Sequence, residues 1–276
     1  MRRPFAQVDV FTTEPGLGNP LAVVLDGSGL DTQAMQRFAS WTNLSETTFV
    51  LPAEDPAADY RVRIFHPDAE LPFAGHPTLG TCHAWLAAGG TPRDASHVVQ
   101  ECGAGLVTVR RDDDALAFGA PPLLRSGPVD EGDLVAIAAS IGVPRSAIVD
   151  AQWGDNGPGW VIVLLESAEA VLAVDPGSVS LDLGLVGLYP PGSEFALEVR
   201  ALYPQHGYVV EDPVTGSLNA SAAGWLLSTG RVTAPYTASQ GTVMGRAGRV
   251  HITLDADGTV WTGGRSVTVI EGTVDI

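Results

Sequence analysis

The sequence contains no lysine, because all 15 of its basic residues are arginine. An enzyme without lysine cannot form an internal Schiff base with pyridoxal phosphate or with a carbonyl substrate. A Walker A nucleotide-binding loop is excluded for the same reason, since that motif requires lysine. No pyridoxal or nucleotide cofactor of these kinds is therefore expected.

Cysteine and long apolar runs are also scarce. The two cysteines, Cys82 and Cys102, are too few to form a disulfide framework in a chain of 276 residues. Arg2 and Arg3 are followed by no apolar leader region, and no apolar run approaches the ~20 residues that cross a bilayer. These observations predict a cytoplasmic protein that has no membrane partner.

Positive charge is sparse, since the 15 basic residues stand against 32 acidic ones and the net charge is −17. Such a surface repels a phosphate backbone, so nucleic acid is not expected as a partner. The simplest meaning of this charge is solubility.

The chain length predicts two domains or lobes, because a domain typically has about 150 residues. Glycine (32) and proline (20) are plentiful, which suits a turn-rich protein containing β-structure. The segment 120–127 contains two adjacent prolines and is interpreted as the connection. We therefore expect lobes at residues 1–122 and 123–276.

A weak internal repeat supports this division. The stretch AGHPTLGTCHAWLAAGG (74–90) resembles VTGSLNASAAGWLLSTG (214–230), and Trp85 and Trp225 are 140 residues apart. At the same offset, the apolar run that starts at Asn19 falls on the one that starts at Gly159. The repeat predicts two related halves, each with a strand, a glycine-bearing turn and a helix.

Strand candidates outnumber helix candidates in both halves, and the two kinds do not alternate strictly, which predicts an α+β fold. The strand candidates are rich in Val, Ile, Thr and aromatic residues: Phe5–Phe11, Leu21–Leu25, Thr47–Leu51, Tyr60–Phe65, Val98–Glu101, Leu106–Arg110, Trp160–Leu165, Ala196–Leu202, Val250–Leu254 and Ser266–Ile270. The helix candidates are Thr32–Trp41, Pro77–Ala88, Leu134–Ile141 and Ser217–Ser228.

Both repeated helices begin with residues that suit an anion. Gly75 permits close approach, and Pro77 stands at a favoured first helical position. In the second half, Thr215, Gly216 and Ser217 supply capping hydroxyls and another glycine. Two such helix starts facing one cleft would bind an anionic substrate through their N–H groups and dipoles. The alternative is that each is simply a well-capped helix.

Glu46 lies where a loop enters the apolar strand that contains Phe49 and Val50. Partial burial would raise the pKa of its carboxyl and let it take and return a proton near neutral pH. Taken alone, Glu46 is one of 32 acidic residues, so a solvated carboxylate at a strand edge is the alternative.

A second polar group offers donors for a metal, namely His66, Asp68, His76 and His83. Their spacing matches no strong ligand signature, and His76 and His83 would lie about two helical turns apart. In the second half, Asp212 precedes the helix start, where it either stabilises the helix dipole or orients His76 or a substrate amine.

Four segments together resemble the PhzF family of phenazine-biosynthesis isomerases. They are GNPLAVV (18–24), NLSETTFV (43–50), ELPFAGHPTLGT (70–81) and EDPVTGS (211–217), and the closing stretch from Met244 is similar as well. The resemblance implies a diaminopimelate-epimerase-like fold, in which two pseudo-symmetric lobes each wrap a β-barrel-like sheet around a central helix. It also implies that the last strand, about 266–276, returns to the first lobe.

The resemblance implies roles for six residues. Glu46 matches the general acid/base, and His76 and Asp212 match supporting catalytic residues. Gly75, Gly216 and Ser217 match groups that bind the substrate carboxylate. No metal or other cofactor is implied, and a homodimer is expected. His66 and Asp68 depart from the family pattern, which bears on the substrate more than on the mechanism.

Epimerases of this fold use two thiols, one at each helix start. The corresponding positions, near Ala74 and Pro213, are not cysteine. The sequence therefore favours a cofactor-independent isomerase that shifts a proton and a double bond in a small carboxylate-bearing metabolite, in antibiotic or other secondary metabolism. The alternatives are an epimerase with a non-thiol base and an inactive small-molecule binding protein.

Overall fold

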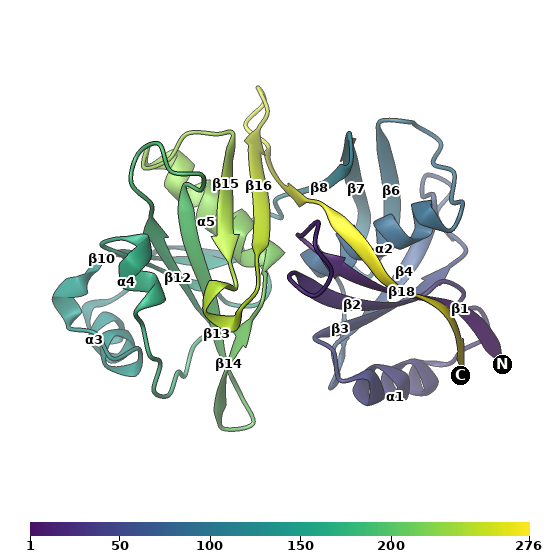
Figure 1. Ribbon diagram of the computed structural model, residues 1–276, viewed down its shortest axis with the longest axis horizontal. Coiled ribbons are helices and arrows are strands. Elements are labelled where there is room, and N and C mark those ends of the chain that lie inside the picture. Colours follow the sequence, from purple (N-terminus) through teal and green to yellow (C-terminus); the bar gives the residue numbers. More distant parts are fainter. The chain divides into compact units, whose positions relative to one another are not determined.

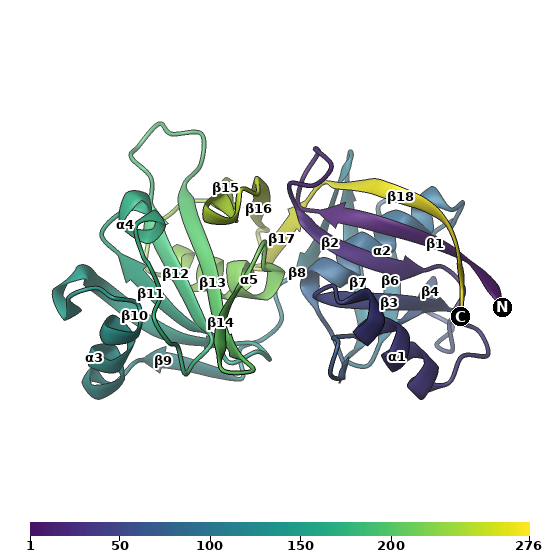
Figure 2. The ribbon, with the colours of Figure 1, turned by 60° about the horizontal axis from the view of Figure 1, so that its bottom comes forward.

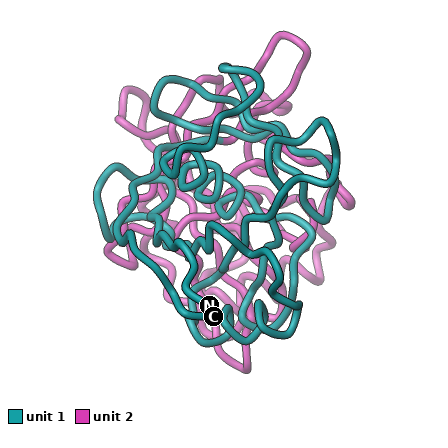
Figure 3. The backbone as a smooth tube through the Cα atoms, turned by 90° about the vertical axis from the view of Figure 1, so that its right-hand side faces the viewer, with its two compact units in different colours: residues 1–119, 263–276 teal, residues 120–262 magenta.

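The computed structural model describes all residues, 1–276, and divides into two compact units. Unit 1 comprises residues 1–119 and 263–276, and unit 2 comprises residues 120–262 (Figure 3). Strands predominate over helices in both units, so the predicted α+β class is confirmed. No helix is long and apolar enough to span a membrane.

Unit 1 contains two helices and nine strands in chain order. These are β1 (Arg2–Val10), β2 (Asn19–Val24), α1 (Thr32–Thr42), β3 (Glu46–Leu51), β4 (Tyr60–Phe65), β5 (Glu70–Leu71), α2 (Gly75–Ala87), β6 (His97–Cys102), β7 (Gly105–Asp112), β8 (Ala115–Gly119) and β18 (Ser266–Asp275).

Unit 2 repeats much of this order, with an additional strand and helix at its start. Its elements are β9 (Arg125–Pro128), α3 (Glu131–Ser140), a short 3-10 turn (Arg145–Ala147), β10 (Ile148–Asp155), β11 (Val161–Leu165), α4 (Ala168–Leu172), β12 (Leu183–Leu188), β13 (Leu197–Gln205), β14 (Tyr208–Asp212), α5 (Gly216–Ser228), β15 (Tyr236–Gln240), a second 3-10 turn (Thr242–Met244), β16 (Gly248–Leu254) and β17 (Val260–Gly264), whose last residues belong to unit 1.

Strand pairing follows the same sequence in the two units. In unit 1, β1–β2 is antiparallel, β2–β3 parallel, β3–β4 antiparallel and β4–β6 parallel. In unit 2, β10–β11, β11–β12, β12–β13 and β13–β15 show the same alternation. Each final parallel pair is joined through a long helix, α2 or α5. The duplication predicted from the 140-residue offset is therefore confirmed at the level of topology.

The long helices α2 and α5 are the central elements of their units. Nine residues of each are buried, on several faces of the helix, as expected for a helix enclosed by sheet rather than lying on a surface. In unit 1, α2 packs against β1, β2, β3 and β8 (Figure 2). Gly80 allows this approach, because a Cβ there would lie 2.6 Å from Leu21 and 2.7 Å from Val10.

The last strand, β18, belongs to unit 1 and runs antiparallel beside the first strand, β1 (Figure 1). The pairing extends from Arg2 opposite Asp275 to Val10 opposite Ser266. The terminal amine of Met1 donates a hydrogen bond to the carbonyl of Ile276 at 2.6 Å. Unit 1 is thus assembled from both ends of the chain.

Three local features differ from the sequence expectations. Phe11 lies outside β1 with φ 65°, so the strand ends one residue earlier than expected. Helix α2 begins at Gly75, which makes Pro77 its third residue; proline is tolerated there because N–H groups of the first turn have no partner within the helix. The segment 120–127 is not wholly a connection, because β9 begins at Arg125 and pairs with β10.

Candidate active site

Glu46 is the first residue of β3 and pairs with Leu21 of β2. Thr48, two residues along β3, accepts a hydrogen bond from the hydroxyl of Thr81 of α2 at 2.8 Å. Because alternate residues of a strand share a face, Glu46 is directed to the same side, toward the first turn of α2. Its side chain is only 15% exposed.

His76, the second residue of α2, is the partner that Glu46 meets there. Its Nε2 atom lies 3.4 Å from Oε2 of Glu46. Burial lowers the pKa of His76 to about 3. The imidazole is therefore neutral near pH 7, and its contact with Glu46 is that of a neutral ring with a carboxylate rather than an ion pair. The structure thus brings together two of the residues that the resemblance assigns to the site.

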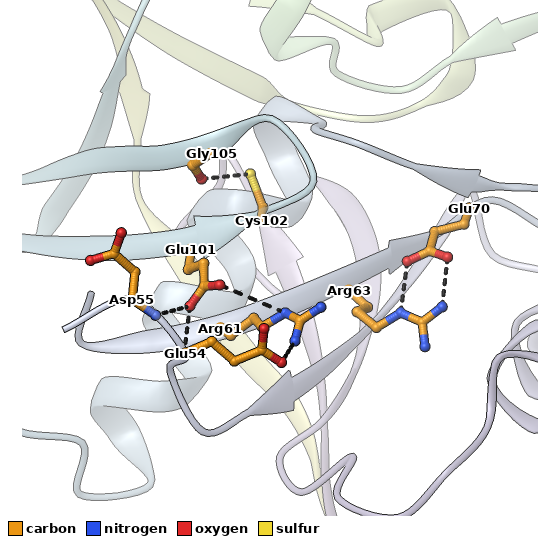
Figure 4. Close-up of polar contacts among 8 residues, drawn as sticks. All are labelled: Glu54, Asp55, Arg61, Arg63, Glu70, Glu101, Cys102 and Gly105. Atoms are coloured by element: carbon orange, nitrogen blue, oxygen red, sulfur yellow. Dashed lines mark hydrogen bonds and ion pairs between the residues drawn. The ribbon is translucent and has the colours of Figure 1, made fainter. Parts of the chain in front are cut away.

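The chain that leads into α2 is fixed by polar contacts. Arg63 of β4 holds Glu70 of β5 with two hydrogen bonds, at 2.7 and 2.6 Å (Figure 4). The N–H of Ala104 donates to the carbonyl of Pro72 at 3.0 Å. Glu70, which lies between Asp68 and the start of α2, therefore has a structural role. The neighbouring Arg61 on β4 likewise faces carboxylates (Figure 4).

Helix α5 begins at Gly216 with Thr215 as its N-cap, and the Thr215 side chain does not cap the helix. Instead, its hydroxyl donates to Oδ2 of Asp212 at 2.5 Å. The expected capping role of Thr215 is thus wrong, because Asp212 at the end of β14 competes successfully for the hydroxyl. Ala74, the N-cap of α2, also makes no side-chain capping bond. Neither N-cap residue therefore caps its helix through its side chain.

Ser217 has the place in α5 that His76 has in α2, since each is the second residue of its helix. The indole N–H of Trp160 donates to the Ser217 hydroxyl at 3.0 Å. In unit 1, the side-chain amide of Asn19 lies 3.4 Å from Nδ1 of His76. Asn19 and Trp160 both stand at the entry of the repeated apolar strand, 141 residues apart. The sequence interpretation used this repeat but assigned neither residue to the site.

The remaining candidates do not gather around His76. His66 lies 3.8 Å from Asp68, and Nε2 of His83 lies 3.0 Å from the Thr268 hydroxyl. No group of three or more His, Cys, Asp or Glu side chains has the geometry to hold a metal ion. Burial raises the pKa of the Cys82 thiol to about 12.

The residues of unit 2 form their own set. Asp212, Gly216 and Ser217 lie within six residues of chain around the start of α5. Glu46, Gly75 and His76 form the corresponding set in unit 1. Each set combines a carboxylate with the first turn of a central helix.

Comparison with known proteins identifies a family over nearly the whole chain. The PhzC-PhzF model, described as phenazine biosynthesis-like protein, matches residues 8–272. An uncharacterized isomerase of Mesorhizobium japonicum is 36% identical, covering 98% of both chains. Trans-2,3-dihydro-3-hydroxyanthranilate isomerase of Pseudomonas aeruginosa is 34% identical, covering 92% of this chain and 91% of its own. The resemblance inferred from the sequence motifs is confirmed.

Solved structures agree about the fold. A phenazine biosynthesis protein of the PhzF family from Bacillus anthracis superposes with a TM-score of 0.85 at 24% identity, covering all of both chains. A hydroxyproline epimerase from Agrobacterium vitis superposes with a TM-score of 0.61 at 15% identity, covering 99% of this chain and 92% of that one. The epimerase-like architecture predicted from the resemblance is therefore confirmed.

Proposed function

Because the chain belongs to the phenazine biosynthesis-like PhzC-PhzF family, we propose that it is a cofactor-independent isomerase with Glu46 as its general acid/base. It would shift a proton and a double bond in a small carboxylate-bearing cyclic or unsaturated metabolite. Two relatives named as isomerases support the reaction class. The observation that carries the assignment is the enclosed Glu46 carboxylate facing a neutral His76.

The proposed reaction balances with one catalytic carboxylate. The Glu46 carboxylate takes a proton from a carbon of the substrate, and the C–H electron pair becomes part of a conjugated anion. The resulting carboxylic acid then returns that proton to another carbon of the same conjugated system, which moves the double bond and regenerates the carboxylate. Because the Glu46 side chain is only 15% exposed, the transferred proton is sheltered from exchange with water.

A single base on one face suits a shift better than an inversion, which needs an acid and a base on opposite faces. Thiols are not available for the second role at the helix starts, where the N-caps are Ala74 and Thr215. Cys82 lies within α2 and is fully buried. These features favour an isomerisation over the two-thiol epimerase mechanism.

We assign the substrate carboxylate to the helix starts. The N–H groups of a first helical turn have no partner within the helix and lie at the positive end of its dipole. Gly75, Gly216 and Ser217 would present such groups to the substrate, while Asp212 would hold an amino or hydroxyl substituent. By analogy with the Pseudomonas relative, a dihydrohydroxyanthranilate-like acid from antibiotic or other secondary metabolism is the first substrate to test.

The test is turnover of trans-2,3-dihydro-3-hydroxyanthranilate and related unsaturated acids in D2O, followed by proton NMR. Glu46→Gln should lower the rate by at least about 10²-fold, because it removes the proton carrier and keeps the side-chain shape. Glu271→Gln, on the exposed strand β18, is the matched control and should retain the rate.

Full activity of Glu46→Gln would refute the proposed role. Inversion at a stereocentre without double-bond migration would identify the epimerase alternative. Binding of these acids with neither double-bond migration nor inversion would identify the inactive binding protein.

A further inference from the structure

Asn19 is a fully buried polar residue beside His76, the side chain that faces Glu46. It is the first residue of β2, and its Nδ2 atom lies 3.4 Å from Nδ1 of His76. A side-chain NH2 group can only donate hydrogen bonds, so Nδ1 of His76 must be the acceptor. An imidazole ring that accepts at Nδ1 and is neutral carries its one proton on Nε2.

The placement of Asn19 is fixed by the turn that precedes it. Oδ2 of Asp9 accepts the N–H groups of Gly16 at 2.7 Å and of Gly18 at 3.0 Å. Gly18 is required at its position, because a Cβ there would lie 2.3 Å from the carbonyl oxygen of Val10. The amide of Asn19 therefore reaches His76 from a rigid strand entry rather than from a mobile loop.

The other ring nitrogen of His76 faces Glu46. Nε2 of His76 lies 3.4 Å from Oε2 of Glu46, and His76 is only 5% exposed. Three side chains from three elements, Asn19 on β2, His76 on α2 and Glu46 on β3, thus follow one another with 3.4 Å between the facing atoms of each pair. Because the Asn19 amide donates to Nδ1, the ring proton lies on Nε2, the nitrogen that faces Glu46.

We propose that Asn19 is a positioning residue, which holds His76 as the Nε2–H tautomer so that His76 donates a hydrogen bond to Oε2 of Glu46. The inference deepens the proposed function and rests on Glu46 as the acid/base. Since Oε2 accepts this bond both before and after proton transfer, the substrate proton is carried on Oε1. The hydrogen bond also stabilises the ionised form of Glu46, which keeps it available as a base.

The tautomer is measured directly by long-range proton–nitrogen NMR on protein labelled with 15N-histidine. The chain has six histidines, and the His76 signals are assigned from their loss in His76→Gln. In the wild-type protein we expect a protonated Nε2 and an unprotonated Nδ1. A protonated Nδ1 in the wild-type protein would overturn the proposal.

Asn19→Asp is the decisive variant, because it keeps the side-chain shape and replaces the donor with an acceptor. The ring should then carry a proton on Nδ1, which the wild-type ring lacks. We expect kcat to fall at least about tenfold with a smaller change in KM, and the acidic limb of the kcat/KM profile to move. Gln33→Glu, on the exposed side of α1, adds the same charge at the surface and should change neither the tautomer nor the rate.

Two outcomes would contradict the positioning role. One is an Asn19→Asp protein whose Nδ1 stays unprotonated, whatever its activity. The other is a protein with Nδ1 protonated but with wild-type kcat. The NMR experiment needs no substrate, so it separates this inference from the proposed function, which fails instead if Glu46→Gln remains active.

Discussion

His76 and Cys82 lie on the same helix, and burial moves their pKa values in opposite directions. The pKa of His76 falls to about 3 and that of Cys82 rises to about 12. Desolvation disfavours the charged form in both cases, which is the imidazolium for His76 and the thiolate for Cys82. Both side chains are therefore neutral across the physiological range. The neutral His76 ring can still donate a hydrogen bond, whereas the Cys82 thiol cannot act as a thiolate nucleophile.

Acid should destabilise the protein through His76. As the pH falls below about 6.5, histidine in the unfolded chain binds a proton, whereas folded His76 stays neutral until about pH 3. The unfolded state therefore gains protons first, and stability is lost as the pH falls. Between pH 7 and pH 5 this contribution is about 2 kcal/mol. Urea unfolding of the wild-type protein and His76→Gln at both pH values measures it.

The expected result is that His76→Gln loses less stability between pH 7 and pH 5 than the wild-type protein does. His97→Gln, whose ring is 36% exposed, is the control and should show the wild-type loss. An equal loss in all three proteins would show that His76 is not the source.

Thiol reagents should not affect catalysis. Cys82 is completely buried in α2, and burial also raises the pKa of Cys102. Iodoacetamide should therefore leave turnover unchanged and should modify Cys82 only after unfolding, which mass spectrometry detects. Loss of activity in step with modification of Cys82 would instead support thiol chemistry.

At the scale of elements, each central helix is fixed at its first turn by a glutamine from the strand that follows it. Gln100 of β6 donates to the Thr78 hydroxyl at 3.0 Å in unit 1. Gln240 of β15 accepts the N–H of Thr215 at 3.0 Å in unit 2. The two glutamines are completely buried and 140 residues apart. In both halves of the duplicated fold, a buried glutamine therefore holds the start of the central helix.

Gln240→Leu should destabilise unit 2. Besides the N–H of Thr215, Gln240 bonds the Thr215 hydroxyl, the Asn219 amide and the carbonyl of Asp212. Leucine of similar size would leave several of these buried groups without a partner, at about 1–3 kcal/mol for each. A lower midpoint of urea unfolding measures the effect. Gln33→Leu, on the exposed side of α1, should leave the midpoint close to that of the wild-type protein.

The central helices and their apolar neighbours could be predicted from the sequence, because the repeat at Trp85 and Trp225 and the apolar runs are local patterns. The glutamine contacts could not be predicted in the same way. Gln100 and Gln240 stand in ordinary strand sequences, and their importance arises from pairing between strands far apart in the chain. The family motifs make Glu46 a candidate, whereas Asn19 lies in one of the same motifs with no feature of its own that predicts a role.

At the scale of the whole molecule, the chain closes unit 1 with its final strand. β18 pairs along the length of β1, and Val274 and Ile276 pack against the apolar cluster that includes Met35 and Phe49. A contact between residues more than 250 positions apart leaves no periodic signal in a sequence. Only the family resemblance predicts that the last strand returns to the first lobe.

Removal of residues 266–276 should therefore unfold unit 1 while unit 2 keeps its amide protection. The truncation takes away the backbone partner of β1 and the side chains of Val274 and Ile276. Hydrogen exchange resolved by peptide is the measurement. Protection of β1 and β2 at the wild-type level would contradict the expectation.

A circular permutant gives the matched control for this truncation. A short glycine-serine linker would join Ile276 to Met1, whose hydrogen bond already brings the termini together. New ends would be opened at Gly192, in the exposed turn between β12 and β13. This protein retains β18 and should show wild-type protection in β1 and β2.

The return of β18 also sets an order of events on the ribosome. Domains that follow one another along a chain commonly fold in the order of their synthesis. Here the second unit is complete at residue 262, whereas the first unit needs residues 263–276. The unit that is translated first is thus the last to be finished, and until residues 266–275 have emerged from the ribosome β1 keeps an unpaired edge that a chaperone can recognise.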